Sequence, residues 1–190
     1  MAWDLFRDLS IAKELSFSEG TITLLGYRLT MINASYISSY IKSIEENRQL
    51  TKQFYESVMN SVIESWGPII MKKYKFGFHE TAKWWVEIVK LAGWGIDAWE
   101  YDDPTLHSGK TSLRNSALLP FLKGNVKYPC DHLMRGCMAG GISAAYNTPI
   151  HVVELECEAM GAEKCRFAYD ELSKLKEKYP DIVEHQILKD

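Results

Sequence analysis

The side chains best suited to chemistry lie in one short stretch, residues 130–169, which contains all four cysteines of the chain. Cys157 and Cys165 flank a seven-residue loop between two segments with strand patterning, so we expect them to meet at the open end of a β-hairpin. Glu154 lies three residues before Cys157, and Cys130 lies just ahead of a helical stretch, where backbone N–H groups favour a thiolate. Three thiolates and one carboxylate would complete a closed tetrahedral Zn²⁺ shell, the structural type with no position open to a substrate.

Two other interpretations of the cysteines stay open. Cys137 shares the helical spacing of Met134, Met138 and Ile142, so it competes as a ligand but is expected on a buried helix face. Alternatively, all four thiols are reduced and buried without a metal, because the sequence contains no CxxC pair. A disulfide framework is disfavoured, since a chain of 190 residues can build a hydrophobic core without bridges.

A helix and a hairpin must position these residues. The helix is expected over 131–146 and the two hairpin strands over 151–156 and 166–169. Small residues along the helix, among them Gly136 and Gly140, allow close packing on a sheet or another helix. These glycines do not form a phosphate loop, because no Lys-Ser/Thr follows them. A zinc ion would staple this C-terminal helix-hairpin unit together.

The rest of the chain shows both helical and strand patterns. The expected elements are a helix near 3–15, a strand or hairpin within 16–32, helices over 48–65 and 80–92, and strands over 94–101 and 110–118. Gly67-Pro68 interrupts the first long helical pattern, and the two long helices should pack on one sheet face. We therefore predict one α+β domain over 1–190, with an antiparallel sheet packed against several helices and a C-terminal helix and tail over 170–190.

Composition and charge narrow the class of protein. A formal net charge of −3 and a pI near 6.0 give no overall attraction to phosphates, so direct nucleic acid binding is not expected. No apolar stretch approaches the ~20 residues that cross a bilayer, and the first residues lack the pattern of a secretory signal. We expect a cytoplasmic protein without a membrane span.

Aromatic residues cluster within 23 positions between the second long helix and the strand that follows it. They could wall an apolar pocket for a small aromatic or lipid ligand, with a few polar groups to orient it. The competing interpretation is that they are ordinary core residues, since aromatic side chains are commonly buried. The candidate ligand-binding residues are His79, Trp85, Trp94, Trp99 and Tyr101.

The segment from Gly136 to Phe167 reads G-x-x-x-G-x₈-P-I-x-x-x-E-x-x-C-x-x-M-G-x-x-x-C-R-F. It resembles the core motif of the 4-vinyl reductase domain family. That family includes a bacteriochlorophyll-pathway protein, small stand-alone archaeal proteins and the aromatic-sensing domains of phenol- and xylene-responsive activators. The resemblance implies a fold similar to that of Golgi transport-particle subunits and of the ligand-binding domains of NO-signalling proteins.

The resemblance also implies a metal site. In the aromatic-sensing members, three cysteines and one glutamate hold Zn²⁺, and their positions correspond here to Glu154, Cys157 and Cys165. The first cysteine position of the family falls on Asp131, one residue after Cys130. A shift of one residue in a loop ahead of a helix is easily absorbed, so Cys130 is the expected fourth ligand.

Sequence motifs of catalysis do not appear: the chain has no G-x-S-x-G, dinucleotide G-x-G-x-x-G, Walker A or HExxH pattern. His132 is an unsuitable base for Cys130, because neighbouring positions at a helix start point in different directions. We therefore predict a sensor or accessory domain for a small apolar or aromatic ligand, stabilised by Zn²⁺, forming a homodimer and acting on a separate protein partner. The alternatives are a tetrapyrrole-pathway reductase or its accessory subunit, and a structural assembly subunit with an acyl-binding channel.

Overall fold

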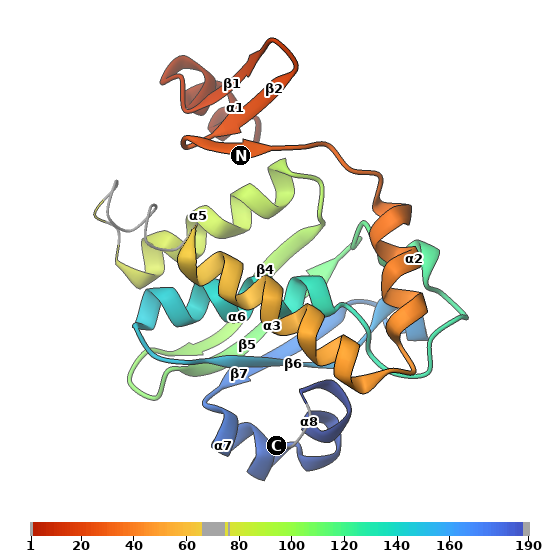
Figure 1. Cartoon of the computed structure of the whole chain (residues 1–190). Helices are drawn as coiled ribbons and strands as arrows, with labels where there is room; N and C mark the ends of the chain where they lie inside the picture. Colours follow the sequence, from red (N-terminus) through yellow and green to blue (C-terminus); the bar gives the residue numbers. More distant parts are fainter. Residues whose placement is uncertain (1, 66–74, 76, 188–190) are drawn as a thin grey trace.

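The structure, a computed structural model, describes residues 2–65, 75 and 77–187. It combines helices with two antiparallel sheets, which confirms the predicted α+β class (Figure 1). The interruption expected at Gly67-Pro68 lies outside the described residues. None of the described helices has both the length and the hydropathy needed to cross a bilayer.

Residues 2–29 form a small N-terminal unit, seen at the top of Figure 1. Its elements are α1 (Ala2–Ile11), β1 (Leu15–Ser18), β2 (Thr21–Leu24) and β3 (Tyr27–Leu29). The three strands pair in sequence order through the two-residue turns Glu19-Gly20 and Leu25-Gly26, in which all four residues have positive φ. Turns with this conformation suit the twist of a hairpin and favour glycine, so the sequence specifies a tight meander here.

The main sheet has the strand order β4-β5-β7-β6, and every neighbouring pair is antiparallel. Its strands are β4 (Ile96–Asp103), β5 (Ser108–Arg114), β6 (His151–Glu156) and β7 (Cys165–Asp170). After β5 the chain passes through the short helix η1 (Leu119–Phe121) and through α6 (His132–Tyr146) to the far edge. A hairpin then returns β7 to the place beside β5.

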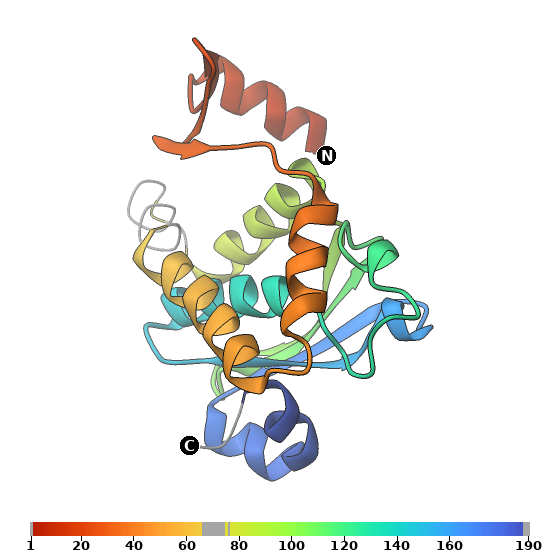
Figure 2. The ribbon, with the colours of Figure 1, turned by 45° about the vertical axis from the view of Figure 1, so that its right-hand side comes forward.

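Helices cover both faces of this sheet (Figures 1 and 2). On one side lie α5 (Phe78–Leu91) and α6, with α3 (Arg48–Glu64) packed on α6. The two long helices are thus on the same side, as expected, although α3 makes its main packing contact with α6. On the other side, α7 (Leu172–Lys178) and α8 (Pro180–Gln186) pack on β6 and β7.

A helix that the sequence patterns did not predict, α2 (Ala34–Ile44), flanks these layers. Its N-cap is Asn33, whose side-chain oxygen accepts a hydrogen bond from the Ser35 backbone N–H at 3.0 Å. α2 buries Ser38, Ile41 and Ile44 on its inner face.

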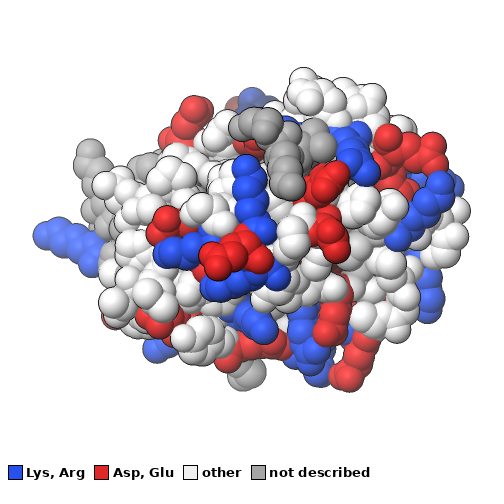
Figure 3. Space-filling model, turned by 90° about the horizontal axis from the view of Figure 1, so that it is seen from below, with Lys and Arg blue, Asp and Glu red and all other residues white. Residues whose placement is uncertain are grey.

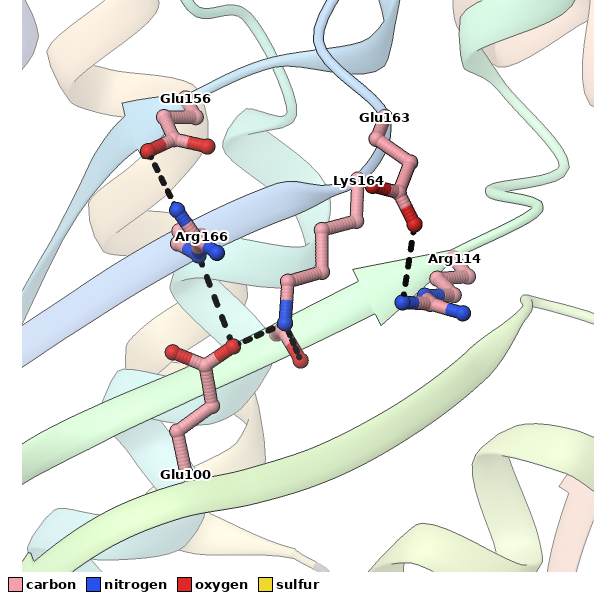
Figure 4. A network of polar contacts seen from close by, with 7 residues as sticks. Glu100, Arg114, Glu156, Glu163, Lys164 and Arg166 are labelled. Carbon is pink, nitrogen blue, oxygen red and sulfur yellow. Dashed lines mark hydrogen bonds and ion pairs between the residues drawn. The ribbon is translucent and has the colours of Figure 1, made fainter.

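The part of the sheet face left open beside α7 and α8 carries a network of ion pairs (Figure 4). Arg166 pairs with Glu156 at 2.7 Å and with Glu100 at 3.5 Å, and Lys164 also pairs with Glu100. Figure 3, which views this side of the molecule, shows basic and acidic residues interspersed over the surface. Because these pairs are partly exposed to water, each contributes little to stability.

Candidate functional site

Four potential metal-binding side chains meet where β6, β7 and the start of α6 converge. Glu154, Cys157 and Cys165 each place a ligand atom within 4.8 Å of the other two, and all three residues are buried. The Cys130 thiol, also buried, forms a hydrogen bond with Cys157. The structure therefore brings together the four residues of the predicted zinc set.

Local backbone features aim these side chains at one point. The β6–β7 register shifts between Glu154 and Glu156, so the strand bends just ahead of Cys157. The loop that follows contains one turn of 3₁₀ helix and then Gly161, whose φ of 97° lies in the left-handed region that favours glycine. Cys165 begins β7 and accepts a hydrogen bond from the Glu158 backbone N–H at 3.3 Å.

Asp131, the position to which the family motif points, has a different role from Cys130. Its carboxylate accepts hydrogen bonds from the Met134 backbone N–H at 3.2 Å and from the Ser116 hydroxyl at 3.0 Å. The first of these bonds caps α6 at its N-terminus. Both carboxylate oxygens of Asp131 are thus engaged, while the thiol of Cys130 contacts Cys157.

The electrostatics of the cluster suit a bound cation. One oxygen of Glu154, Oε2, accepts from the Asp131 backbone N–H at 2.8 Å, whereas Oε1 is buried with no hydrogen-bond partner among the described residues. Burial and the nearby Cys157 raise the pKa of Glu154. Hydrogen bonds from Cys130 and Cys165 lower the pKa of Cys157, and the same contacts raise the pKa of those two thiols. A buried carboxylate oxygen beside three sulfurs matches the ligand types that Zn²⁺ prefers, so the residues present fit this metal.

Residues that sequence patterns did not identify support the cluster from behind. The Gln186 side chain bonds both backbone groups of Glu154, accepting from N–H at 2.8 Å and donating to C=O at 2.7 Å. Arg135, fully buried, donates to the Val152 carbonyl at 3.1 Å and to the Gln186 carbonyl at 3.0 Å. Burial and the charge of Arg135 lower the pKa of His132 to about 3, so this histidine is neutral and accepts a hydrogen bond from the guanidinium.

A large cavity lies apart from the cluster, between the N-terminal unit and helices α3, α5 and α6. Its volume is about 550 Å³, within the range of small-molecule sites in proteins. The described residues that line it include no charged side chain, and most of them are aliphatic or aromatic. They include Phe6, Leu15, Phe17, Ile22, Leu24, Leu29, Val62, Trp85, Ile88, Val89, Trp94, Leu133, Met134 and Cys137.

A second and much smaller cavity of about 30 Å³ is enclosed by α5, β4, β5 and α6. Trp85 lines both cavities, and Trp99 and Asp97 line only the smaller one. Asp97 is 3% exposed, and this burial raises the pKa of its carboxyl to about 7. The carboxyl was not among the residues predicted from the sequence, where Asp97 lies inconspicuously within a strand pattern.

The predicted aromatic residues separate into two groups. Trp85, Trp94 and Trp99 each line a cavity, and Trp99 also packs edge-to-face on Tyr169 with ring centroids 5.6 Å apart. His79 and Tyr101 are exposed and line neither of the two cavities. Cys137, expected in the core, is half-buried at the wall of the large cavity, whereas its helical neighbours Met134 and Met138 are buried as predicted.

The segment that carries the cluster was compared with known protein families. Residues 119–170 match the vinyl-4-reductase domain. The matched region contains η1, α6 and the β6–β7 hairpin, together with all four cysteines, so the family segment and the metal cluster coincide. No curated protein sequence matches the chain.

Solved structures with similar folds extend the likeness over most of the chain. The phenol-responsive sensory domain of the transcription activator PoxR, solved with phenol, is 17% identical and has a TM-score of 0.76, covering 97% of this chain and 98% of that one. A vinyl-4-reductase family protein from Methanocaldococcus jannaschii is 20% identical with a TM-score of 0.50, covering 76% and 84%. A trafficking protein particle complex subunit 3 from Naegleria fowleri, bound to palmitic acid, is 13% identical with a TM-score of 0.46, covering 73% and 94%. At these identities the likeness establishes the fold alone.

Proposed function

We propose that this chain is a ligand-binding sensor or accessory domain, which holds a small apolar or aromatic molecule and is stabilised by one structural Zn²⁺. The observation that carries the proposal is the 550 Å³ cavity, whose described lining is mostly apolar and includes Trp85 and Trp94. Burial of an apolar ligand there would be favourable because it removes hydrocarbon surface from water. The similar fold of a phenol-responsive sensory domain supports the same function.

A neutral fluorescent probe, N-phenyl-1-naphthylamine, tests the cavity. We expect it to bind with enhanced emission and to raise the melting temperature by mass action. Cys137→Phe should weaken binding strongly, because the ring would occupy space at the cavity wall, whereas Cys137→Ala should bind as wild type. Equal probe binding by the two variants, both shown by circular dichroism to be folded, would remove the cavity from consideration.

The zinc part of the proposal assigns Cys130, Glu154, Cys157 and Cys165 as ligands. Zn²⁺ would there neutralise clustered thiolates and tie the start of α6 to the β6–β7 hairpin, a stabilising role that needs no open coordination position. All four positions are then filled by protein, which is compatible with binding at a separate cavity and not with catalysis at the metal.

Cysteine substitutions test the metal with a matched control. We expect about one zinc per chain in protein purified without chelator, and loss of that zinc in Cys157→Ala with a melting temperature lower by roughly 10 °C or more. Cys137→Ala, which removes a thiol outside the cluster, should retain the metal. Zinc content near zero in wild type, with unchanged stability of Cys157→Ala, is the result that would exclude the site.

We further propose that the chain forms a homodimer and passes its signal to a separate protein. Exposed apolar residues on α2 and on the loop before it support a self-association surface, since monomers rarely expose contiguous apolar patches.

A further inference from the structure

The small cavity beside Asp97 contains an unmatched pair of polar atoms. Asp97 Oδ1 is a buried acceptor and Trp85 Nε1 a buried donor, and neither has a hydrogen-bond partner within the described part of the chain. Both residues line the same space of about 30 Å³, which holds roughly two water molecules. Buried polar groups in folded proteins are nearly always hydrogen-bonded, so this pair points to a missing partner.

One kind of atom completes both groups at once. The indole N–H of Trp85 can only donate, and an ionised carboxylate can only accept. A hydroxyl oxygen does both: it accepts from Trp85 and donates to Asp97. The neighbouring Thr111 hydroxyl donates to the Met138 sulfur at 3.4 Å, a weak acceptor, and this residue is also part of the cavity wall.

We propose that this cavity receives the hydroxyl group of a neutral alcohol, held between Asp97 Oδ1 and Trp85 Nε1, and that Asp97 thereby selects the ligand. The inference rests on the proposed ligand-binding function and names the polar end of the ligand. Trp85 lines both cavities, so the hydrocarbon body extends past its indole into the larger space. The large cavity accepts apolar molecules in general, and Asp97 distinguishes among them by their head groups.

The surroundings of Asp97 exclude other head groups. A carboxylate or other anion would face the Asp97 carboxylate within an apolar wall, and an aldehyde or ketone offers no proton to it. Lys90 on α5 acts on Asp97 through its charge, but its ammonium is already paired with Glu87 at 2.8 Å. The raised pKa of Asp97 is consistent with a carboxyl whose neighbours leave its charge poorly compensated.

A set of probes with one hydrocarbon body tests the proposal: toluene, benzyl alcohol, benzaldehyde and benzylamine. Dissociation constants measured by calorimetry on the full chain should favour benzyl alcohol over toluene and benzaldehyde by on the order of tenfold, the usual strength of one hydrogen bond to a charged group. Asp97→Leu should abolish this preference and leave toluene binding unchanged. Trp85→Phe, which keeps an aromatic ring but lacks the N–H, should reduce the preference severalfold.

Each other result has a definite meaning. Equal affinities for benzyl alcohol and toluene in wild type would overturn the proposal and indicate that the polar pair is bridged by water, while the apolar ligand function would stand. Tighter binding of benzylamine than of benzyl alcohol would overturn it in favour of a cation paired with Asp97. Failure of every probe, toluene included, would instead count against the proposed function itself.

Discussion

Glu154 and Asp97 are both deeply buried carboxyl groups, and each has one oxygen without a hydrogen-bond partner among the described residues. Their neighbours give them different chemistry. Glu154 lies beside three thiols, so a cation would satisfy it and the sulfurs together. Asp97 lies among Trp85, Trp99 and aliphatic groups, where a neutral donor is the better complement. Residue type alone does not distinguish a metal ligand from a specificity group.

The pKa of Asp97 predicts how stability depends on pH. Burial raises this pKa to about 7 in the folded protein, above its ordinary value near 3.8, so the folded state binds the proton more tightly than the unfolded state does. The free energy of unfolding of wild type should therefore decrease as pH rises from about 4 to 7, and the full cost, on the order of 4 kcal/mol, should persist above pH 7.

Asp97→Asn removes the titrating group and serves as the comparison. Urea denaturation of both proteins between pH 4 and 8, without ligand, should show the variant gaining stability relative to wild type as pH increases. Changes at the metal cluster affect both proteins alike, so the difference isolates Asp97. A difference that does not vary with pH would contradict the assignment of a raised pKa to this carboxyl.

Among the elements, α6 connects all the features discussed, because its start adjoins the metal cluster and its length faces α3 and both cavities. Its contact with α3 depends on glycine. A Cβ atom at Gly140 would lie 2.5 Å from the Met59 carbonyl oxygen, and one at Gly136 would lie 2.8 Å from that of Tyr55. Backbone at this distance cannot move aside without displacing α3.

Two alanine substitutions on neighbouring positions of α6 test this packing. Gly140→Ala should destabilise the protein by about 1–3 kcal/mol, because the methyl group is forced against backbone. Gly141→Ala has no atom within 4 Å of its Cβ, so it should be neutral or stabilising by up to about 1 kcal/mol through helix propensity. Similar effects of the two substitutions in urea denaturation would show that α3 and α6 are not in close contact.

Elements with strong local patterns were predicted well from the sequence. Helices α3, α5 and α6 and the β6–β7 hairpin lie within a few residues of their expected positions, because helical spacing and strand alternation are local properties. Helix α2 was missed, since its serines weaken the helical signal, although Asn33 as an N-cap was a detectable start. The pairing of β5 with β7 and the burial of Arg135 depend on contacts between distant segments, and no local pattern encodes them.

At the scale of the whole molecule, apolar side chains on the surface are concentrated near one element. Met31, Ile32, Tyr36 and Tyr40 are all exposed, Met31 by 81%, and the last three follow at intervals of four residues along α2 and the turn before it. This spacing places them on one side of the helix, opposite the buried Ser38 and Ile41. The proposed homodimer would cover this side.

The dimer predicts a mass in solution of twice the chain mass of 21.8 kDa. Tyr36→Glu combined with Tyr40→Glu should produce monomers at micromolar concentrations, because a charged residue buried in an interface without a partner is costly. Phe121→Glu, an equally drastic change at an exposed residue in η1, should leave the dimer intact. Light scattering of the three proteins decides, and a monomeric wild type would refute the prediction.

The strand order β4-β5-β7-β6 has a consequence for the birth of the protein. As the chain leaves the ribosome, the β4–β5 hairpin emerges early, but its neighbour β7 is made about fifty residues later, and the outer strand β6 pairs with β7. The hairpin must therefore wait with an open edge, a state in which strands are prone to pair with other chains. Cys165 arrives with β7 itself, so the sheet is sealed and the last ligand of the cluster delivered by the same few residues. Metal availability at that moment would set how long the unfinished sheet stays exposed to aggregation.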